Sequence, residues 1–155
     1  MSLLFGKETI SVDDKGRFSI PASIRGALPK EAESTFMIVR GTEGCLFAYP
    51  KNEWLKFWES LNKLPVTREN TRLIRRILGS LKETKLDGQG RVTLTQQLKE
   101  LSGIKDDIIL MGAGNKLLLW NSEAWAQYQS ESEKTSTYDD DFYRALETDR
   151  NRNDE

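Results

Sequence analysis

The sequence contains no histidine and only one cysteine, Cys45. The missing imidazole removes the most common general base and the most common zinc ligand, and a single thiol cannot form a disulfide within the chain. No stretch approaches the roughly 20 apolar residues that a membrane-spanning helix needs, and the start, MSLLFGKE, shows no secretory signal. We therefore expect a cytoplasmic protein without catalytic residues, metal site or cofactor, which contacts neither a membrane nor a small-molecule substrate.

The charge that is present is distributed unevenly. The whole chain of 155 residues has a net charge of −1. Residues 129–155 contain 4 basic and 9 acidic residues, whereas the other 128 residues contain 19 basic and 15 acidic ones. An acidic tail of −5 therefore hides a mildly basic body of +4, and the net charge does not argue against a nucleic-acid partner.

A short motif occurs twice. Residues 12–24 read VDDKGRFSIPASI and residues 86–98 read LDGQGRVTLTQQL. The copies lie 74 residues apart, too far for a small solenoid repeat and about right for two tandem half-domains. Three pairs are identical: Asp13 with Asp87, Gly16 with Gly90, and Arg17 with Arg91. The sequence thus predicts a duplicated unit with a paired charged turn, and such turns often carry function.

Each half is predicted to run strand, strand, short helix, strand, strand, helix. A two-stranded hairpin is marginally stable alone, so we expect an α+β fold in which the hairpins of the two halves interleave into one small β-barrel about a pseudo-twofold axis. The expected parts are a first repeat over 7–53, a helical connector over 54–80, a second repeat over 81–124, and a C-terminal helix with an acidic, disordered tail over 125–155.

Two further features sit on predicted helices. Trp54, Phe57 and Trp58 have helical spacing, which favours a core or a subunit interface over a base-stacking platform. Within 68–76, four arginines form a second basic candidate, but such runs are more often a solvated face or pair with a neighbouring subunit's acids.

The chain resembles the MraZ family of bacterial regulators over about residues 5–128. The resemblance rests on the doubled motif, Ile20-Pro21, the run RRILG at 75–79, and the segment 112–120 ending in Leu-Trp. The resemblance implies two AbrB-like swapped-hairpin halves with flanking helices, and assembly into a closed ring. It also implies a nucleoid-associated protein that binds short, spaced G-rich direct repeats of double-stranded promoter DNA and represses the division and cell-wall gene cluster.

The motif side chains suit DNA. An arginine, here Arg17 or Arg91, can make a two-pronged contact with guanine or phosphate. Lys15 would add a phosphate contact, and Gln89 could pair with adenine or phosphate. The remaining motif residues are expected to orient the arginines (Asp13, Asp87) and to permit the turn (Gly16, Gly90). The copies differ at Lys15/Gln89, Asp14/Gly88 and Pro21/Thr95, so equal affinity does not follow.

Two alternatives stay open at this point. The aspartate and arginine of each turn could form a structural ion pair that only pins the hairpin. The whole chain could also be a ring-forming protein–protein interaction module that does not bind DNA. An enzyme is disfavoured, because no nucleophile–base pair or phosphate loop is visible.

Overall fold

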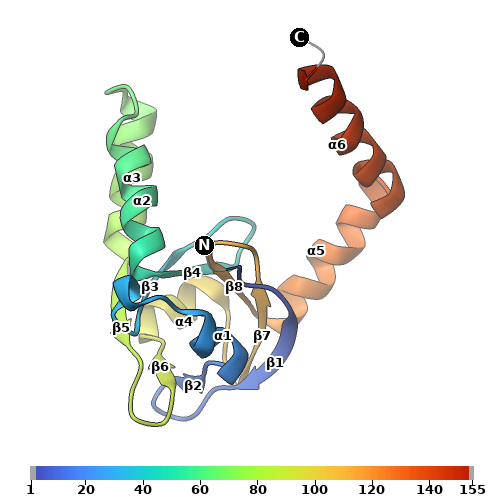
Figure 1. Cartoon of the computed structure of the whole chain (residues 1–155). Coiled ribbons are helices and arrows are strands. Elements are labelled where there is room, and N and C mark those ends of the chain that lie inside the picture. Colours follow the sequence, from blue (N-terminus) through green and yellow to red (C-terminus); the bar gives the residue numbers. More distant parts are fainter. Residues whose placement is uncertain (1–2, 154–155) are drawn as a thin grey trace. The chain divides into compact units, whose positions relative to one another are not determined.

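The computed structural model describes residues 3–153, and its elements follow the order that the duplication predicts (Figure 1). The first repeat holds β1 (Lys7–Ser11), β2 (Arg17–Ser19), α1 (Ala22–Ala27), the 3-10 helix η1 (Lys30–Ala32), β3 (Thr35–Arg40) and β4 (Leu46–Pro50). Helices α2 (Lys51–Asn62) and α3 (Arg68–Ser80) follow. The second repeat holds β5 (Lys82–Lys85), β6 (Arg91–Thr93), α4 (Gln96–Ser102), β7 (Asp107–Gly112) and β8 (Leu117–Trp120). The chain continues with α5 (Ser122–Thr135) and α6 (Tyr138–Asn153).

The strands of the two repeats are interleaved. Six strands form one antiparallel sheet in the order β1-β7-β8-β4-β3-β5, so β1 of the first repeat pairs with β7 of the second, and β5 of the second pairs with β3 of the first. The strands that follow the two motif turns, β2 and β6, pair only with each other. The predicted α+β class and the interleaving of the halves are confirmed.

The register of the strands is reciprocal between the repeats. In the β2–β6 ladder Phe18 faces Val92, its own counterpart at the offset of 74 residues. Beyond the motif the repeats align at an offset of 71, as Tyr49 with Trp120 shows, and in the β4–β8 ladder Phe47 faces its counterpart at this offset, Leu118. These self-equivalent pairs mark a pseudo-twofold axis. The expected single closed barrel is not found among residues 3–153, whose strands form two separate sheets. The second sheet is small, because β2 and β6 are only three residues long and each is soon followed by a helix.

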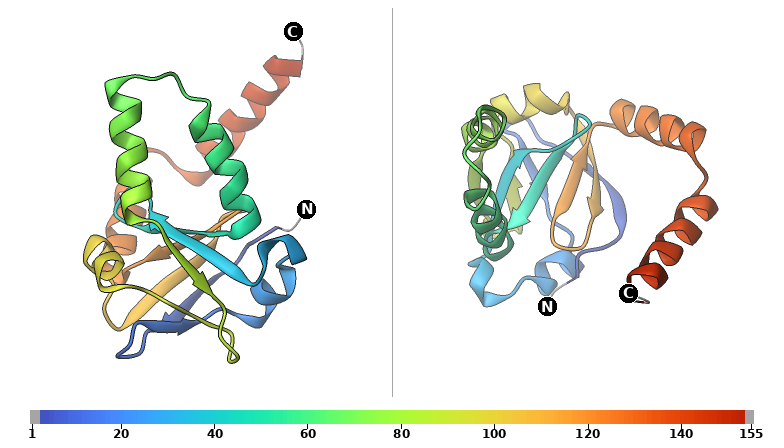
Figure 2. Two further views of the ribbon diagram at one scale, coloured as in Figure 1. Left: turned by 90° about the vertical axis from the view of Figure 1, so that its left-hand side faces the viewer. Right: turned by 90° about the horizontal axis from the view of Figure 1, so that it is seen from above.

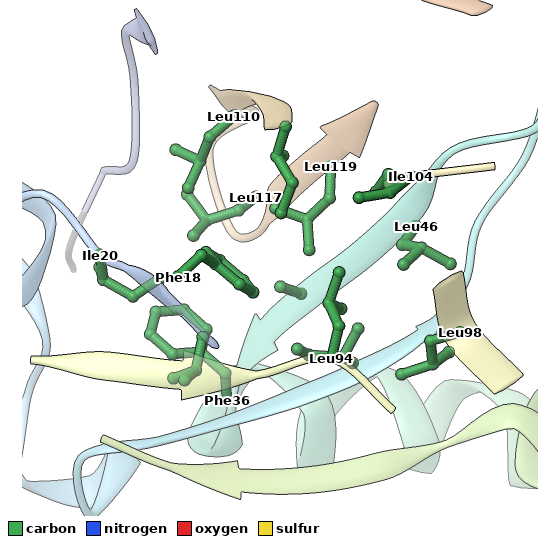
Figure 3. Close-up of a cluster of buried hydrophobic side chains, with 14 of the residues drawn as sticks. Phe18, Ile20, Phe36, Leu46, Leu94, Leu98, Ile104, Leu110, Leu117 and Leu119 are labelled. Atoms are coloured by element: carbon green, nitrogen blue, oxygen red, sulfur yellow. The ribbon is translucent and has the colours of Figure 1, made fainter. Parts of the chain in front are cut away.

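The main hydrophobic core lies between these strands and the short helices α1 and α4 (Figure 3). Its side chains come from both repeats and point toward one another, so neither repeat buries its apolar face without the other. The residues labelled in Figure 3 are all buried: Phe18, Ile20, Phe36, Leu46, Leu94, Leu98, Ile104, Leu110, Leu117 and Leu119.

Helices α2 and α3 form an antiparallel hairpin that projects away from β2 and β6 (Figures 1 and 2). Trp54 is buried in a second core cluster with Val39 and Tyr49, which confirms its predicted place in the core. The Thr67 hydroxyl accepts a hydrogen bond from the Asn70 amide at 3.1 Å and caps the N-terminus of α3. The apolar side chains of α3 are only partly covered, because Leu73 and Leu78 are more than 40% exposed.

The chain from Glu123 onward forms a separate unit. The structure describes a helix, α6, where the sequence favours a disordered tail. Its local chemistry suits a helix: the Thr137 hydroxyl accepts a hydrogen bond from the Asp140 amide, the first turn holds three aspartates, and the last turn holds Arg150 and Arg152. Acids at the N-terminus and bases at the C-terminus complement the helix dipole. Among residues 3–153, no helix is both long and apolar enough to cross a membrane.

Candidate nucleic-acid interface

The first motif turn is held by the carboxylate of Asp13. Its Oδ1 accepts hydrogen bonds from the amides of Lys15 (3.0 Å) and Arg17 (2.8 Å), and its Oδ2 accepts one from Nε of Arg17 (2.7 Å). The Gly16 amide closes the turn by donating to the Asp13 carbonyl at 2.9 Å. The aspartate therefore fixes the backbone of the turn and the direction of the arginine together.

The second turn repeats this geometry. Oδ1 of Asp87 accepts hydrogen bonds from the amides of Gln89 and Arg91, both at 2.9 Å, and Oδ2 accepts one from Nε of Arg91 at 2.9 Å. Gly90 donates to the Asp87 carbonyl at 3.0 Å. The duplicated sequence thus builds two nearly identical turns.

Each aspartate uses only one edge of its arginine. Among the residues that the structure describes, no partner holds the Nη groups of Arg17 or Arg91. The side chains of Arg17 and Arg91 remain 34% and 25% exposed. The outer edge of each guanidinium therefore keeps its two-pronged donor geometry for a ligand.

The two arginines project from one face of the β2–β6 ladder. Arg17 lies opposite Thr93, and Arg91 lies opposite Ser19. Directly opposite residues, and residues two apart on one strand, point to the same face. The two arginines are diagonal neighbours, whose Cα atoms are typically roughly 7–8 Å apart, so the fold brings together two residues that are 74 positions apart in the sequence.

The aspartates of both turns are stabilised as carboxylates. The pKa of Asp13 lies below its ordinary value, chiefly because the Arg17 amide donates a hydrogen bond to the carboxylate; the Arg17 side chain adds to the effect. The pKa of Asp87 is lowered in the same way by the Arg91 amide. Both ion pairs are therefore charged at neutral pH.

Lys15 and Gln89 occupy the same place in the two turns, and both are exposed. Their amides hold the turn, while neither side chain has a hydrogen-bond or ion-pair partner among the described residues. Each lies two residues before the motif arginine in the sequence, and they differ in charge and in hydrogen-bonding groups, an ammonium in Lys15 and an amide in Gln89.

One further residue, Arg25 of α1, lies beside the second turn although it is not part of the sequence motif. Its Nε donates a hydrogen bond to the Ile20 carbonyl at 3.0 Å. A Cβ atom added to Gly90 would lie 2.7 Å from Nη1 and 2.8 Å from Cζ of Arg25, so this guanidinium rests directly against the turn. The offset of 74 pairs Arg25 with Lys99, and this repeated cation after each motif is the signal that could have found it.

The four arginines of α3, Arg68, Arg72, Arg75 and Arg76, line an open groove with Thr67 and Thr71. None of them forms an ion pair within the part of the chain that the structure describes. They belong to the helical hairpin that projects away from β2 and β6 (Figures 1 and 2), so they are not part of the surface formed by the motif turns. The described residues also contain no cluster of three histidine, cysteine or acidic side chains that could hold a metal ion.

Comparison with known proteins agrees with this duplicated architecture. The model of the family described as "MraZ protein, putative antitoxin-like" matches the chain twice, over residues 3–77 and 77–146. The second match extends into α6, beyond the 5–128 span of the resemblance seen in the sequence.

Individual relatives match most of the chain. The transcriptional regulator MraZ of Natranaerobius thermophilus is 33% identical over 134 residues, which cover 86% of this chain and 91% of the relative. That of Heliobacterium modesticaldum is 34% identical over 131 residues, covering 84% and 89%. That of Lactobacillus helveticus is 34% identical over 139 residues, covering 89% and 93%.

Proposed function

Because the chain belongs to the MraZ family, we propose that it is a sequence-specific DNA-binding regulator of transcription. It represses the division and cell-wall gene cluster by occupying spaced, G-rich direct repeats in a promoter. It acts in the nucleoid by occupancy of DNA, without catalysis or a cofactor. The relatives described above carry the name transcriptional regulator, which supports the general class.

The observation that carries the proposal is the pair of outward guanidinium edges on one face of the β2–β6 ladder. Each arginine is fixed through Nε to an aspartate and offers its Nη groups to solvent. A fixed guanidinium loses little side-chain freedom when it binds, and its two parallel N–H groups match O6 and N7 of guanine. Arg17 and Arg91 are thus the base or phosphate readers in this proposal.

The neighbouring side chains extend the same surface. Lys15 contributes a point charge to phosphate, and Gln89 contributes an amide that can pair with adenine or with a phosphate oxygen. Asp13 and Asp87 act as positioning residues through the hydrogen bonds described above. The ion pair therefore serves both to pin the turn and to aim the arginine.

We further propose that several copies assemble into a closed ring. One turn reads only a few bases, and a good two-pronged contact discriminates by about 1–3 kcal/mol. Several protomers on repeated sites multiply such weak contacts through effective concentration. Exposed apolar side chains on and beside the α2–α3 hairpin (Leu55, Val66, Leu73 and Leu78) support contacts between copies.

The test is a fluorescence anisotropy titration of a duplex with spaced G-rich direct repeats and of a scrambled duplex. The wild type is compared with Arg17→Ala, Arg91→Ala and the double variant, with Arg76→Ala on α3 as a control of equal charge change. We expect each motif variant to lose about tenfold in affinity for the repeat duplex, and Arg76→Ala to lose little. Circular dichroism and light scattering check that each variant remains folded and assembled.

The outcomes separate the proposal from its rival. Equal wild-type affinity for both duplexes, or folded motif variants that bind as tightly as the wild type, would overturn it. A ring that binds no DNA would instead support the protein–protein interaction module. A loss confined to Arg76→Ala would move the DNA site to the arginine groove of α3.

A further inference from the structure

The two motif turns differ in the charge of their surroundings. The first turn contains two acids, Asp13 and Asp14, and two bases, Lys15 and Arg17, so its formal charge is zero. The second contains Asp87 and Arg91 and is also neutral by itself, because Gly88 and Gln89 replace the charged pair. Within the motifs alone, neither turn has an excess of positive charge.

Arg25 changes this balance at the second turn. Gly90 is buried, and the Arg25 guanidinium fills the space that a side chain at position 90 would take. At Gly16 the three atoms nearest to such a Cβ, apart from those of the adjacent residues Lys15 and Arg17, all belong to the Leu94 backbone. A guanidinium therefore packs against the glycine of the second turn, whereas backbone atoms pack against the glycine of the first.

Arg25, like the motif arginines, is held by a hydrogen bond from its Nε, but the acceptor is a backbone carbonyl instead of a carboxylate. Its Nε donates to the Ile20 carbonyl, and the Ile20 amide in turn donates to the Gly90 carbonyl at 3.0 Å. No carboxylate among the described residues pairs with Arg25, and the side chain is exposed. Its guanidinium is thus anchored through Nε and lies against Gly90, the residue that precedes Arg91 in the chain.

We propose that Arg25 of the first repeat completes the second turn as the principal phosphate-binding site of the chain, so that this site is built from both repeats. The second turn then has two guanidinium groups, that of Arg25 against Gly90 and that of Arg91, and guanidinium N–H groups are strong donors to phosphate oxygens. The first turn binds phosphate more weakly, because Asp14 repels the anion and Lys15 offers only a flexible point charge. As a statement about DNA, this inference rests on the proposed function, but phosphate binding can be tested without it.

Lys99 is the matched control. It occupies the position equivalent to Arg25 after the second motif, and its ammonium has no hydrogen-bond or ion-pair partner among the described residues. Arg25→Gln and Lys99→Gln remove the same charge at equivalent places. Arg25→Lys keeps the charge but loses the anchored fork, and it serves as a second variant if Arg25→Gln folds poorly.

The DNA experiment measures the affinity for the scrambled duplex as a function of salt. Arg25→Gln should lose about tenfold in affinity and lower the slope of log K against log salt by about one, the effect of losing one phosphate contact. Lys99→Gln should change both quantities less. An Arg25→Gln variant that melts at lower temperature but keeps the wild-type slope would show that Arg25 only pins the turn.

The deciding experiment titrates inorganic phosphate into the full-length, glycine-selectively 15N-labelled protein and follows the amide signals of Gly16 and Gly90. The Gly90 signal should move further than the Gly16 signal, and in Arg25→Gln the difference should disappear. Arg25→Lys should retain a reduced difference. Equal movement in the wild type, or an unchanged Gly90 response in both Arg25 variants, would overturn the inference, whether or not the protein binds DNA.

Discussion

Phe18 and Val92 lie directly opposite each other at the centre of the β2–β6 ladder, and each side chain is only 1% exposed. Because alternate residues of a strand point to opposite faces, burial of this pair turns Arg17 and Arg91 toward solvent. The hydrophobic contact between the repeats and the exposure of the charged edge are therefore two results of one register.

Replacing Phe18 with alanine should strongly lower the free energy of unfolding. Removal of a fully buried phenylalanine costs about 3–5 kcal/mol, and here it also separates the two repeats. The exposed neighbour Ser19 provides the control, since Ser19→Ala should change the free energy of unfolding by no more than about 0.5 kcal/mol. Urea denaturation measures both; a similar small effect for Phe18→Ala would mean that the ladder does not join the repeats as described.

Alanine at the two turn glycines should have unequal effects. Both residues have positive φ, +80° for Gly16 and +74° for Gly90, which costs an alanine about 1–2 kcal/mol. At Gly16 the added Cβ would also collide with the Leu94 carbonyl oxygen, which is part of the backbone, whereas at Gly90 it would meet the Arg25 side chain, which can shift at the cost of its one hydrogen bond. Urea denaturation should therefore rank Gly16→Ala as the more destabilising change, and the reverse order would contradict the two environments.

The aspartates of the turns make stability depend on pH in the acid range. The folded-state pKa values of Asp13 and Asp87 lie below the ordinary value of 3.8. A carboxyl group with a lowered folded-state pKa stabilises the fold fully above the unfolded-state pKa, and this contribution is lost as the pH falls through the folded-state value. The double variant Asp13→Asn, Asp87→Asn should therefore melt below the wild type at neutral pH.

Thermal melts of both proteins over the acid range measure this difference. The gap in melting temperature should be constant above about pH 5 and should narrow below about pH 4 as the wild-type carboxylates become protonated. A gap that stays the same down to pH 3 would show that the carboxylate charge is not what holds the turns.

Much of the fold follows from the sequence, because the duplicated motif sets the turns, the glycines and the following helices at equivalent places. The Thr67 cap and the Trp54 core position follow from local patterns. The pairing of β1 with β7 is less accessible: it joins residues about a hundred positions apart, and the sequence shows only that some such pairing must bury both halves.

The site is predictable to a similar degree. The Asp13–Arg17 and Asp87–Arg91 pairs follow from their spacing, whereas Arg25 lies outside the motif and reaches Gly90 only through the interleaved fold. The composition of α6 does not by itself predict a helix, since a run of three aspartates is typical of disorder as well as of a helix N-terminus. The contact of Arg25 thus depends on the tertiary fold, whereas the acidic run is a local pattern that is compatible with two structures.

Assembly predicts a steep dependence of affinity on the number of DNA repeats. If several protomers of a ring bind at once, a duplex with several correctly spaced repeats should bind far more tightly than one with a single repeat, through effective concentration. Changing the spacing between the repeats by half a helical turn of the DNA should remove most of this gain in affinity. Anisotropy titrations with the wild type measure the effect, and equal affinity for single and multiple repeats would contradict binding by an assembly.

The most direct test of the central claim is the ratio of affinities for the repeat duplex and the scrambled duplex, measured for the wild type and for the double variant Arg17→Lys, Arg91→Lys. Lysine keeps the positive charge but cannot form the two-pronged contact with guanine. We predict that the variant retains most of its affinity for scrambled DNA and loses at least about tenfold in the ratio. A folded, assembled variant with an undiminished ratio would show that the paired turns do not read the sequence of the DNA.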